Sequence, residues 1–197
     1  SQVEFLPFLK YEKWGFIDSL GFVRVKAEYD AVEKFKGGFS VVSKDEKYGV
    51  INKKGDLIID LIYEEMYDFY EGVAVVGQNN LYGMINTSGE LVLKIEFDDI
   101  SDMKKGLIKA ERNGLFGFYD KNGFEKIESI YDDAQDFIDG KVIVSKNGKY
   151  GIIDKFGMPL IDFKFDQLEY FNNEILAVEY DGFWGLINFE KDTILNF

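Results

Sequence analysis

Acidic side chains are the groups in this sequence that could do chemistry, and one acid recurs at a fixed spacing. At intervals of 34 residues an acid follows an aromatic residue, at Asp30, Glu64, Asp98, Asp132 and Asp166. Together with a neighbouring acid such as Asp99 or Asp133, it could contribute to a Ca²⁺ site, which needs several carboxylate and carbonyl oxygens. However, no copy contains an Asp-x-Asp-x-Asp loop with its glycine and distal glutamate. We therefore expect no metal site and interpret the acid as an Asx-type turn that caps a strand.

Other catalytic chemistries find little support in the residue types. Paired carboxylates can act as acid and base when the pKa of one is raised. With 36 acids in 197 residues, however, some pair is expected to lie close together by chance, so proximity alone does not indicate an active site. The chain contains no cysteine and no histidine, which removes thiolate nucleophiles, thiolate zinc sites and the usual general base. It also lacks the glycine-rich nucleotide motifs and the Gly-x-Ser-x-Gly elbow. We therefore predict a protein that is not an enzyme, with no catalytic residues and no cofactor.

The charge balance restricts the possible partners. Acids outnumber lysine and arginine by 36 to 23, so the formal charge is −13, and basic residues cluster no more densely than the pair Lys53-Lys54. A nucleic-acid binder needs such residues to displace counterions from phosphates, so we expect no nucleic-acid partner. No apolar run approaches the roughly 18 residues of a membrane-spanning helix, and we expect no membrane insertion. The first residues, from Ser1, lack the basic and then apolar pattern of a signal sequence. We make no prediction of the cellular compartment.

The segments that must position these acids form a repeat of 34 residues. An aromatic residue followed by glycine marks each copy, at Trp14-Gly15, Tyr48-Gly49, Tyr82-Gly83, Phe116-Gly117, Tyr150-Gly151 and Trp184-Gly185. A second glycine follows six residues after the first in every copy except the last, where Lys191 stands. Because these landmarks keep one period without insertions, we predict a single domain over residues 1–197 that contains six copies.

Each copy predicts three short antiparallel strands. Apolar runs such as residues 73–76 and 142–144 are typical of strands covered on both faces, and dipeptides such as Asn147-Gly148 close tight hairpins. The glycine of the aromatic-glycine pair lies inside the second strand and indicates a bulge or a close neighbour. After the second strand comes the pattern Asp/Asn-x-x-Gly, which predicts a type I turn before the third strand. We expect little helix beyond a turn near residues 31–36 and its equivalents.

These residues resemble a known family. The segment Gly-Lys-Tyr-Gly-Ile-Ile-Asp-Lys-Phe-Gly at positions 148–157, followed by Phe-Asp and a further Phe, is similar to the WG (KWG) repeat, and the similarity recurs along essentially the whole chain. The resemblance implies a bacterial, β-rich interaction module and supplies no catalytic residues. This chain departs from the pattern because only the first and last copies keep tryptophan. It also has Asp60-Leu61 and Lys94-Ile95 where the family usually has consecutive prolines.

We predict an all-β fold in which six three-stranded units stack in an open, solenoid-like array, with a closed, propeller-like ring as the alternative. The aromatic residues of the aromatic-glycine pairs are expected to form a core ladder between units. Contact with a partner is predicted at aromatic residues that replace polar residues of other copies, Tyr70, Tyr180 and Phe183, although these could equally cap an exposed end. The predicted function is a non-catalytic module that binds a protein or a glycan. The alternatives are a structural spacer and, third, a carboxylate hydrolase.

Overall fold

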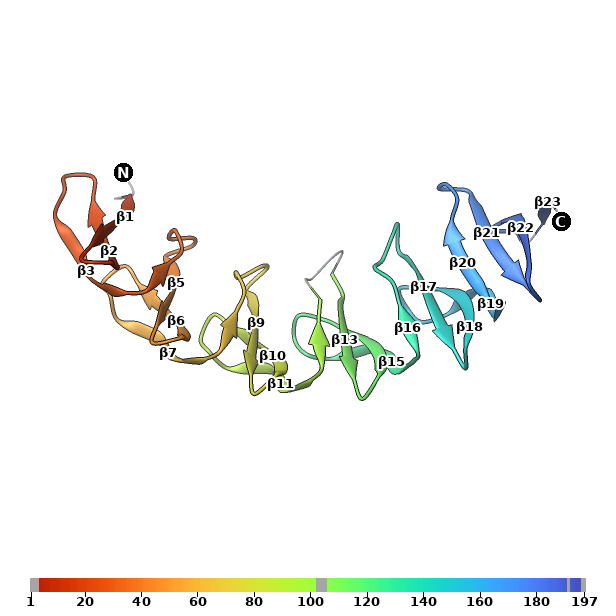
Figure 1. Cartoon of the computed structure of the whole chain (residues 1–197), viewed down its shortest axis with the longest axis horizontal. Helices are drawn as coiled ribbons and strands as arrows, with labels where there is room; N and C mark the ends of the chain where they lie inside the picture. The colour runs from red at the N-terminus through yellow and green to blue at the C-terminus, as the bar shows by residue number, and fades with distance from the viewer. Residues whose placement is uncertain (1–3, 102–105, 191, 196–197) are drawn as a thin grey trace. The chain divides into compact units, whose positions relative to one another are not determined.

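The computed structural model describes residues 4–101, 106–190 and 192–195. Within these ranges the chain is all-β, with six small antiparallel sheets and no helix (Figure 1). The predicted helical turn near residues 31–36 is wrong, because Ala31–Val32 form a short strand. None of the described segments is a helix long and apolar enough to cross a membrane. The chain divides into two compact units, Ser1–Glu96 and Phe97–Phe197.

The first compact unit contains three sheets. Their strand orders are β1-β2-β3, β4-β5-β6-β7 and β8-β9-β10-β11, and neighbouring strands are antiparallel wherever the register is defined. The strand bounds are β1 Phe5–Lys10, β2 Lys13–Asp18, β3 Val23–Tyr29, β4 Ala31–Val32, β5 Phe39–Lys44, β6 Lys47–Asn52, β7 Leu57–Tyr63, β8 Glu65–Met66, β9 Val73–Gln78, β10 Leu81–Asn86 and β11 Leu91–Phe97.

The second compact unit also contains three sheets. Their orders are β12-β13-β14-β15, β16-β17-β18-β19 and β20-β21-β22-β23. The strand bounds are β12 Asp99–Ile100, β13 Ile108–Arg112, β14 Leu115–Tyr119, β15 Glu125–Tyr131, β16 Asp133–Ala134, β17 Lys141–Lys146, β18 Lys149–Asp154, β19 Pro159–Phe165, β20 Gln167–Tyr170, β21 Ile175–Tyr180, β22 Phe183–Asn188 and β23 Thr193–Leu195.

A short strand at the aromatic-acid corner joins one sheet to the next. After β3 ends at Tyr29, the chain passes through Asp30 into β4, which pairs with β5 of the following sheet. The backbone N–H of Asp30 donates to the carbonyl of Ser43 at 2.8 Å, and that of Glu33 donates to the carbonyl of Val41 at 2.8 Å. This corner adds a fourth strand to five of the six described sheets, where the sequence predicted three.

Successive sheets within a unit share hydrophobic cores. In β5, Val42 packs in one core with Phe16 of the first sheet, whereas Val41 packs in another core with Ala74 and Val76 of the third sheet. Neighbouring residues of a strand point to opposite faces, so one strand contributes to both cores. In the second unit, β17 divides its residues in the same way between two cores. The prediction of strands covered on both faces is confirmed for residues 73–76 and 142–144, whereas in residues 175–178 only Leu176 and Val178 are buried.

The glycine of the aromatic-glycine pair lies where the third strand comes very close. Between the pairs Tyr48↔Tyr63 and Val50↔Ile59 the register shifts, so that β7 carries a bulge opposite Gly49. A Cβ on Gly49 would lie 2.6 Å from the carbonyl oxygen of Ile59, which is closer than real Cβ contacts allow. Both predicted reasons for this glycine, a bulge and a close neighbour, are therefore confirmed.

The predicted turn between the second and third strands is also present. Gly55 has a φ of 87°, and its N–H donates to the carbonyl of Asn52 at 3.0 Å. The side-chain oxygen of Asn52 accepts the backbone N–H groups of Lys54 at 2.7 Å and Asp56 at 3.1 Å. This Asx turn holds the ends of the second and third strands together, and it recurs at Asp18, Asn86, Asp120 and Asp154.

Replacing Gly151 by alanine is expected to lower the free energy of unfolding by at least about 2 kcal/mol, because the new Cβ overpacks the sheet. That Cβ would lie 2.7 Å from the carbonyl oxygen of Ile161. Gly148→Ala is the control for a methyl group that meets nothing within 4 Å, and a smaller loss is expected there, because the φ of 72° at Gly148 strains alanine without overpacking. Urea unfolding measures both. Equal losses in the two variants would contradict the close approach at Gly151.

Candidate functional site

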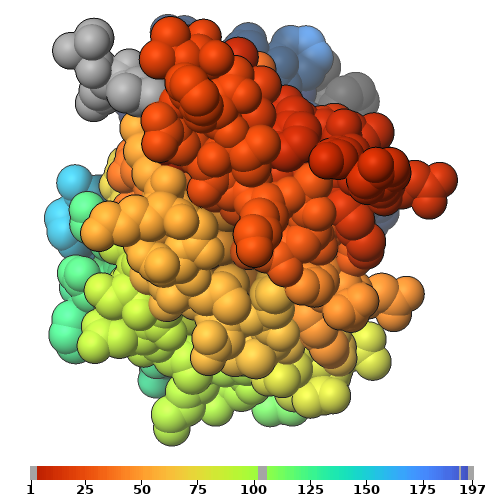
Figure 2. Space-filling view, turned by 90° about the vertical axis from the view of Figure 1, so that its left-hand side faces the viewer, coloured from red at the N-terminus to blue at the C-terminus, as the bar shows by residue number. Residues whose placement is uncertain are grey.

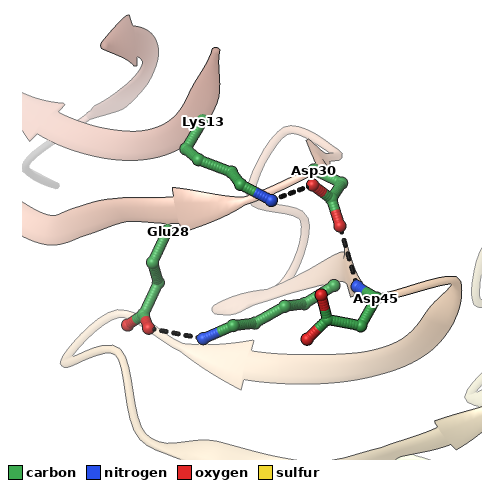
Figure 3. Close-up of polar contacts among 5 residues, drawn as sticks. Lys13, Glu28, Asp30 and Asp45 are labelled. Atoms are coloured by element: carbon green, nitrogen blue, oxygen red, sulfur yellow. Dashed lines mark hydrogen bonds and ion pairs between the residues drawn. The ribbon is translucent and has the colours of Figure 1, made fainter. Parts of the chain in front are cut away.

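The repeated acid connects two hairpins. One carboxylate oxygen of Asp30 accepts a hydrogen bond from the Lys13 ammonium, and the other accepts the backbone N–H of Asp45 at 2.8 Å (Figure 3). The two partners lie 17 residues before and 15 residues after the acid, at the tips of successive hairpins. Beside them, Glu28 forms an ion pair with Lys44 at 2.9 Å. The predicted Asx-type turn at this acid is therefore wrong, because its hydrogen bonds are long-range.

The arrangement recurs with a lysine at two further acids. Glu64 accepts a hydrogen bond from Lys47 at 3.0 Å and from the backbone N–H of Asn79 at 2.7 Å. Asp166 accepts hydrogen bonds from the Lys149 ammonium and, at 2.9 Å, from the backbone N–H at the following hairpin tip. We call each acid with its lysine and its tip N–H an acid clamp.

Two copies keep the acid but lack the lysine. Asp98 accepts the backbone N–H of Asn113 at 2.6 Å, and Asp132 accepts that of Gly148 at 2.9 Å. Leu81 and Leu115 occupy the positions that hold lysine in the complete clamps. The contact between acid and hairpin tip is therefore common to five copies, whereas the cation varies.

The lysine lowers the pKa of the acid that it contacts. In Asp30, Glu64 and Asp166, the lysine hydrogen bond is the largest cause of a pKa below the ordinary value, followed by the hydrogen bond from the tip N–H. These carboxylates therefore stay ionised in moderately acidic solution. A general acid needs the opposite, a raised pKa, so the recurring acids are suited to fastening hairpins.

The acids also form no evident metal site. Among the described residues, no group of three or more Asp or Glu side chains is placed to hold a metal ion. Where a described carboxyl group has a clearly shifted pKa the shift is downward, at Asp18, Asp30, Glu64, Asp120, Glu125 and Asp166. At Asp18, burial raises the pKa, but hydrogen bonds from Arg24 and two backbone N–H groups outweigh it.

The aromatic residues of the aromatic-glycine pairs flank the cores and are not the fully buried ladder that the sequence predicted, since Tyr48, Phe116 and Tyr150 are only partly buried against a core. Trp14, Tyr48, Tyr82, Phe116 and Tyr150 are half-buried, and Trp184 is 40% exposed. By contrast, the aromatic residues of the aromatic-acid pairs are buried, namely Tyr29, Tyr63, Phe97, Tyr131 and Phe165. Hydrogen bonding explains part of this incomplete burial, since the hydroxyl groups of Tyr82 and Tyr150 donate to Glu65 and Asp133 near the surface.

Two of the three predicted partner residues lie together. Tyr180 and Phe183 pair directly across the tip of the β21–β22 hairpin and are 52% and 67% exposed. The ring of Phe165 packs edge-on against Tyr180 with centroids 6.5 Å apart. Trp184 follows Phe183 and is also exposed, although the sequence interpretation assigned it to a core ladder. We call Tyr180 and Phe183 the hairpin patch.

The third predicted residue, Tyr70, belongs to the first compact unit. It is 58% exposed and lies just before β9, where its backbone N–H donates to the carbonyl of Val73 at 2.9 Å. The nearby Tyr67 is 49% exposed. Tyr70 is therefore accessible, as a contact residue must be, but it is a separate feature from the hairpin patch.

Comparison with known proteins identifies the repeat. The model of the WG-containing repeat matches residues 14–48, 48–82, 82–116, 116–150 and 150–184, each span running from one aromatic-glycine pair to the next. The chain belongs to the WG-containing repeat family. The predicted resemblance is thereby confirmed for five copies, and the sheet β20-β21-β22-β23 extends beyond the last matched span. No curated protein matches the chain in sequence.

Several solved structures are weakly similar to this WG chain. Kluyveromyces lactis Hsv2 is 10% identical with a TM-score of 0.42, and the match covers 81% of this chain and 60% of that one. A eukaryotic initiation factor is 10% identical with a TM-score of 0.47, covering 100% of this chain and 74% of the other. PorZ of Porphyromonas gingivalis is 8% identical with a TM-score of 0.36, covering 96% and 31%. The chain thus spans less than two thirds of the Hsv2 chain, and such low scores decide neither fold nor function.

Replacing Asp166 by asparagine is expected to destabilise the WG chain at neutral pH, because Lys149 loses its carboxylate. The pKa of Asp166 is lowered on folding, so this stabilisation is present above the unfolded pKa of about 4 and is lost as the pH falls through the folded value. Asp132→Asn is the control, since Asp132 has a tip N–H but a leucine at the lysine position. Urea midpoints across pH and salt measure the difference. Equal pH profiles for both variants would contradict a role for the lysine.

Proposed function

We propose that this WG-repeat chain is a non-catalytic module that binds a protein partner through the hairpin patch. The observation that carries the proposal is the exposure of two paired aromatic rings, Tyr180 and Phe183, at one hairpin tip. Exposed aromatic clusters are uncommon on monomer surfaces, and tyrosine and tryptophan are enriched among residues that dominate protein interfaces.

The repeat itself does not require aromatic residues at these positions. Tyr180 stands where other copies have Lys44, Gln78, Arg112 and Lys146, and those copies fold into the same hairpin. Phe183 stands where the complete acid clamps have lysine. Since neither ring serves a need shared by the copies, binding is a better explanation for the pair than folding.

The hairpin patch is also held in a defined geometry. The tip residues Asp181 and Gly182 have φ values of 50° and 82°, which are typical of a tight two-residue turn. The N–H of Asp181 is fastened to Asp166 at 2.9 Å, and Phe165 supports the ring of Tyr180. A preformed patch loses less conformational freedom when a partner binds, which favours affinity.

The described acids support a non-catalytic function. Those with a clearly shifted pKa are shifted downward, and the recurring ones are engaged with lysine and hairpin tips. A hydrolase that uses two carboxylates needs one acid with a raised pKa.

We further propose that the six sheets continue as an open, solenoid-like array, with a closed, propeller-like ring as the alternative. Support comes from the packing inside each compact unit, where a sheet shares its cores with the sheets next to it. In such arrays stability arises between neighbours, and the surface stays extended.

Replacing Tyr180 and Phe183 by lysine, the residue that several other copies carry there, is expected to weaken partner binding by about 2 kcal/mol or more without lowering the thermal midpoint. Phe156→Lys is the control, because Phe156 is 71% exposed in the same unit but lies outside the hairpin patch. The measurement is capture of proteins by wild type and variants, followed by titration with the captured protein. Unchanged capture of proteins by the double variant would contradict the proposal. If the chain binds only to a glycan panel and captures no protein, the partner is a glycan and the proposal of a protein partner is wrong.

The array proposal predicts an elongated particle in small-angle X-ray scattering, because neighbour-only stacking extends with each copy. The radius of gyration is expected to exceed the value of about 16 Å for a compact 197-residue domain. A compact particle with a central hollow in the scattering profile would favour the closed ring.

A further inference from the structure

Two hairpin tips of the second compact unit consist of an asparagine followed by a glycine. Asn113-Gly114 joins β13 to β14, Asn147-Gly148 joins β17 to β18, and all four residues are exposed. Their φ values lie between 53° and 74°, as in a tight two-residue turn. A Cβ on either glycine would meet nothing within 4 Å, so the space beside each glycine is open.

The reaction open to such a tip is deamidation. The backbone nitrogen of the glycine attacks the side-chain carbonyl carbon of the asparagine and forms a C–N bond, while the amide nitrogen leaves as ammonia and takes up the proton of the glycine N–H. Water then opens the succinimide ring at one of its two carbonyl carbons, which yields aspartate or isoaspartate. Glycine favours the reaction because it has no Cβ to obstruct the approach of its nitrogen.

A third tip has the same shape but a different second residue. Asn79-Asn80, between β9 and β10, is exposed and has φ values of 55° and 59°. The side chain of Asn80 obstructs the approach of its own nitrogen, whereas glycine leaves that approach free. The three tips therefore separate the effect of the second residue from the effect of the turn within one molecule.

The acids that hold the two Asn-Gly tips are the two that lack a lysine. Asp98 accepts the N–H of Asn113, Asp132 accepts that of Gly148, and leucine stands at the lysine position of both. In the complete acid clamps, by contrast, two of the three tips begin with aspartate, at Asp45 and Asp181. Among the five described contacts between an acid and a tip, a tip aspartate thus occurs only where the lysine is present.

The lysine compensates for the second negative charge. The hydrogen bond to Asp166 is the largest cause that raises the pKa of Lys149, and the charge of Asp181 raises it further, so the ammonium group lies near both carboxylates. A carboxylate formed at Asn147 would instead lie near Asp132 with Leu115 in the place of the lysine. Like charges at short range repel, and here no lysine at that position offsets the repulsion.

We infer that Asn113 and Asn147 are deamidation sites, and that their conversion weakens the contact between the hairpin tip and the acid that holds it. The new carboxylate repels that acid, and isoaspartate also adds one carbon atom to the backbone of a tight turn. This modification does not involve the hairpin patch.

The contact that is weakened joins one copy to the next. Figure 2 shows how closely successive copies pack in the first unit, where the red atoms of the first copy lie against the orange atoms of the second. Since each copy is stabilised mainly by its neighbours, a tip that loses its acid loosens the repeat at that point. Deamidation would therefore act as a slow, irreversible change in how firmly copies of the second unit hold together.

Peptide mapping by mass spectrometry tests the reaction on the full chain, incubated at mildly alkaline pH so that the attacking nitrogen can lose its proton. Asn113 and Asn147 are expected to show the mass gain of an amide-to-acid conversion at least about tenfold faster than Asn79. Gly148→Ala should slow the conversion of Asn147 and leave that of Asn113 unchanged. No conversion at either Asn-Gly tip, or equal rates at all three tips, would overturn the inference.

Aspartate variants test the consequence of the new charge. Asn147→Asp should lower the urea midpoint, and salt should reduce this loss, whereas Asn79→Asp should leave the midpoint unchanged because Glu64 is paired with Lys47. Adding Leu115→Lys to Asn147→Asp should restore the midpoint, with Leu115→Lys alone as the reference, since this side chain is 36% exposed and tolerates a lysine. Equal shifts for the two aspartate variants, or no rescue by the added lysine, would contradict the proposed effect of the charge.

Discussion

Each sheet of this protein is too small to cover its own hydrophobic faces, and every other feature follows from how that surface is buried. A strand such as β5 turns Val42 toward the preceding sheet and Val41 toward the following one, so both faces of the strand are buried. Burial of apolar area is the dominant favourable contribution to folding, and here each core combines residues of successive copies. The third strand must approach closely to complete each sheet, which is why the second strand contains glycine at Gly49 and Gly151.

The aromatic-acid corner carries out three tasks in the five residues 29–33. Its aromatic residue enters a shared core, its backbone pairs with the next sheet, and its carboxylate holds a hairpin tip, as Tyr29, Asp30 and Glu33 show. Because all three contacts link one copy to the next, the corner sets the spacing of successive sheets. The lysine of the acid clamp is an addition that copies can lose, as Leu81 and Leu115 show, and the surface is consequently free to differ between copies. The hairpin patch is one such difference.

Much of the local structure could be predicted from residue patterns. The strands, the Asn52-to-Gly55 turn and the bulge opposite Gly49 follow from β-branched runs, an Asx residue and a glycine inside a strand. The short fourth strand was missed because two residues such as Ala31–Val32 are too few to show any periodicity. The acid clamp was missed for a different reason. Its signal is a lysine 17 residues before an acid, and a separation of that length has no local meaning until the hairpins are placed.

From the sequence alone, the 34-residue period, the family and the all-β class could be determined, because each depends on residue types that recur at one spacing. The tertiary structure decided which aromatic residue of each copy is buried. Tyr63 and Tyr48 are the same residue type, but Tyr63 is buried in the core that successive sheets share, whereas Tyr48 is half-buried against it. It also decided what the acids do, since the two partners of Asp30 come from different hairpins and meet only when the sheets pack. Burial and long-range hydrogen bonding are properties of the packed sheets, and no single strand contains them.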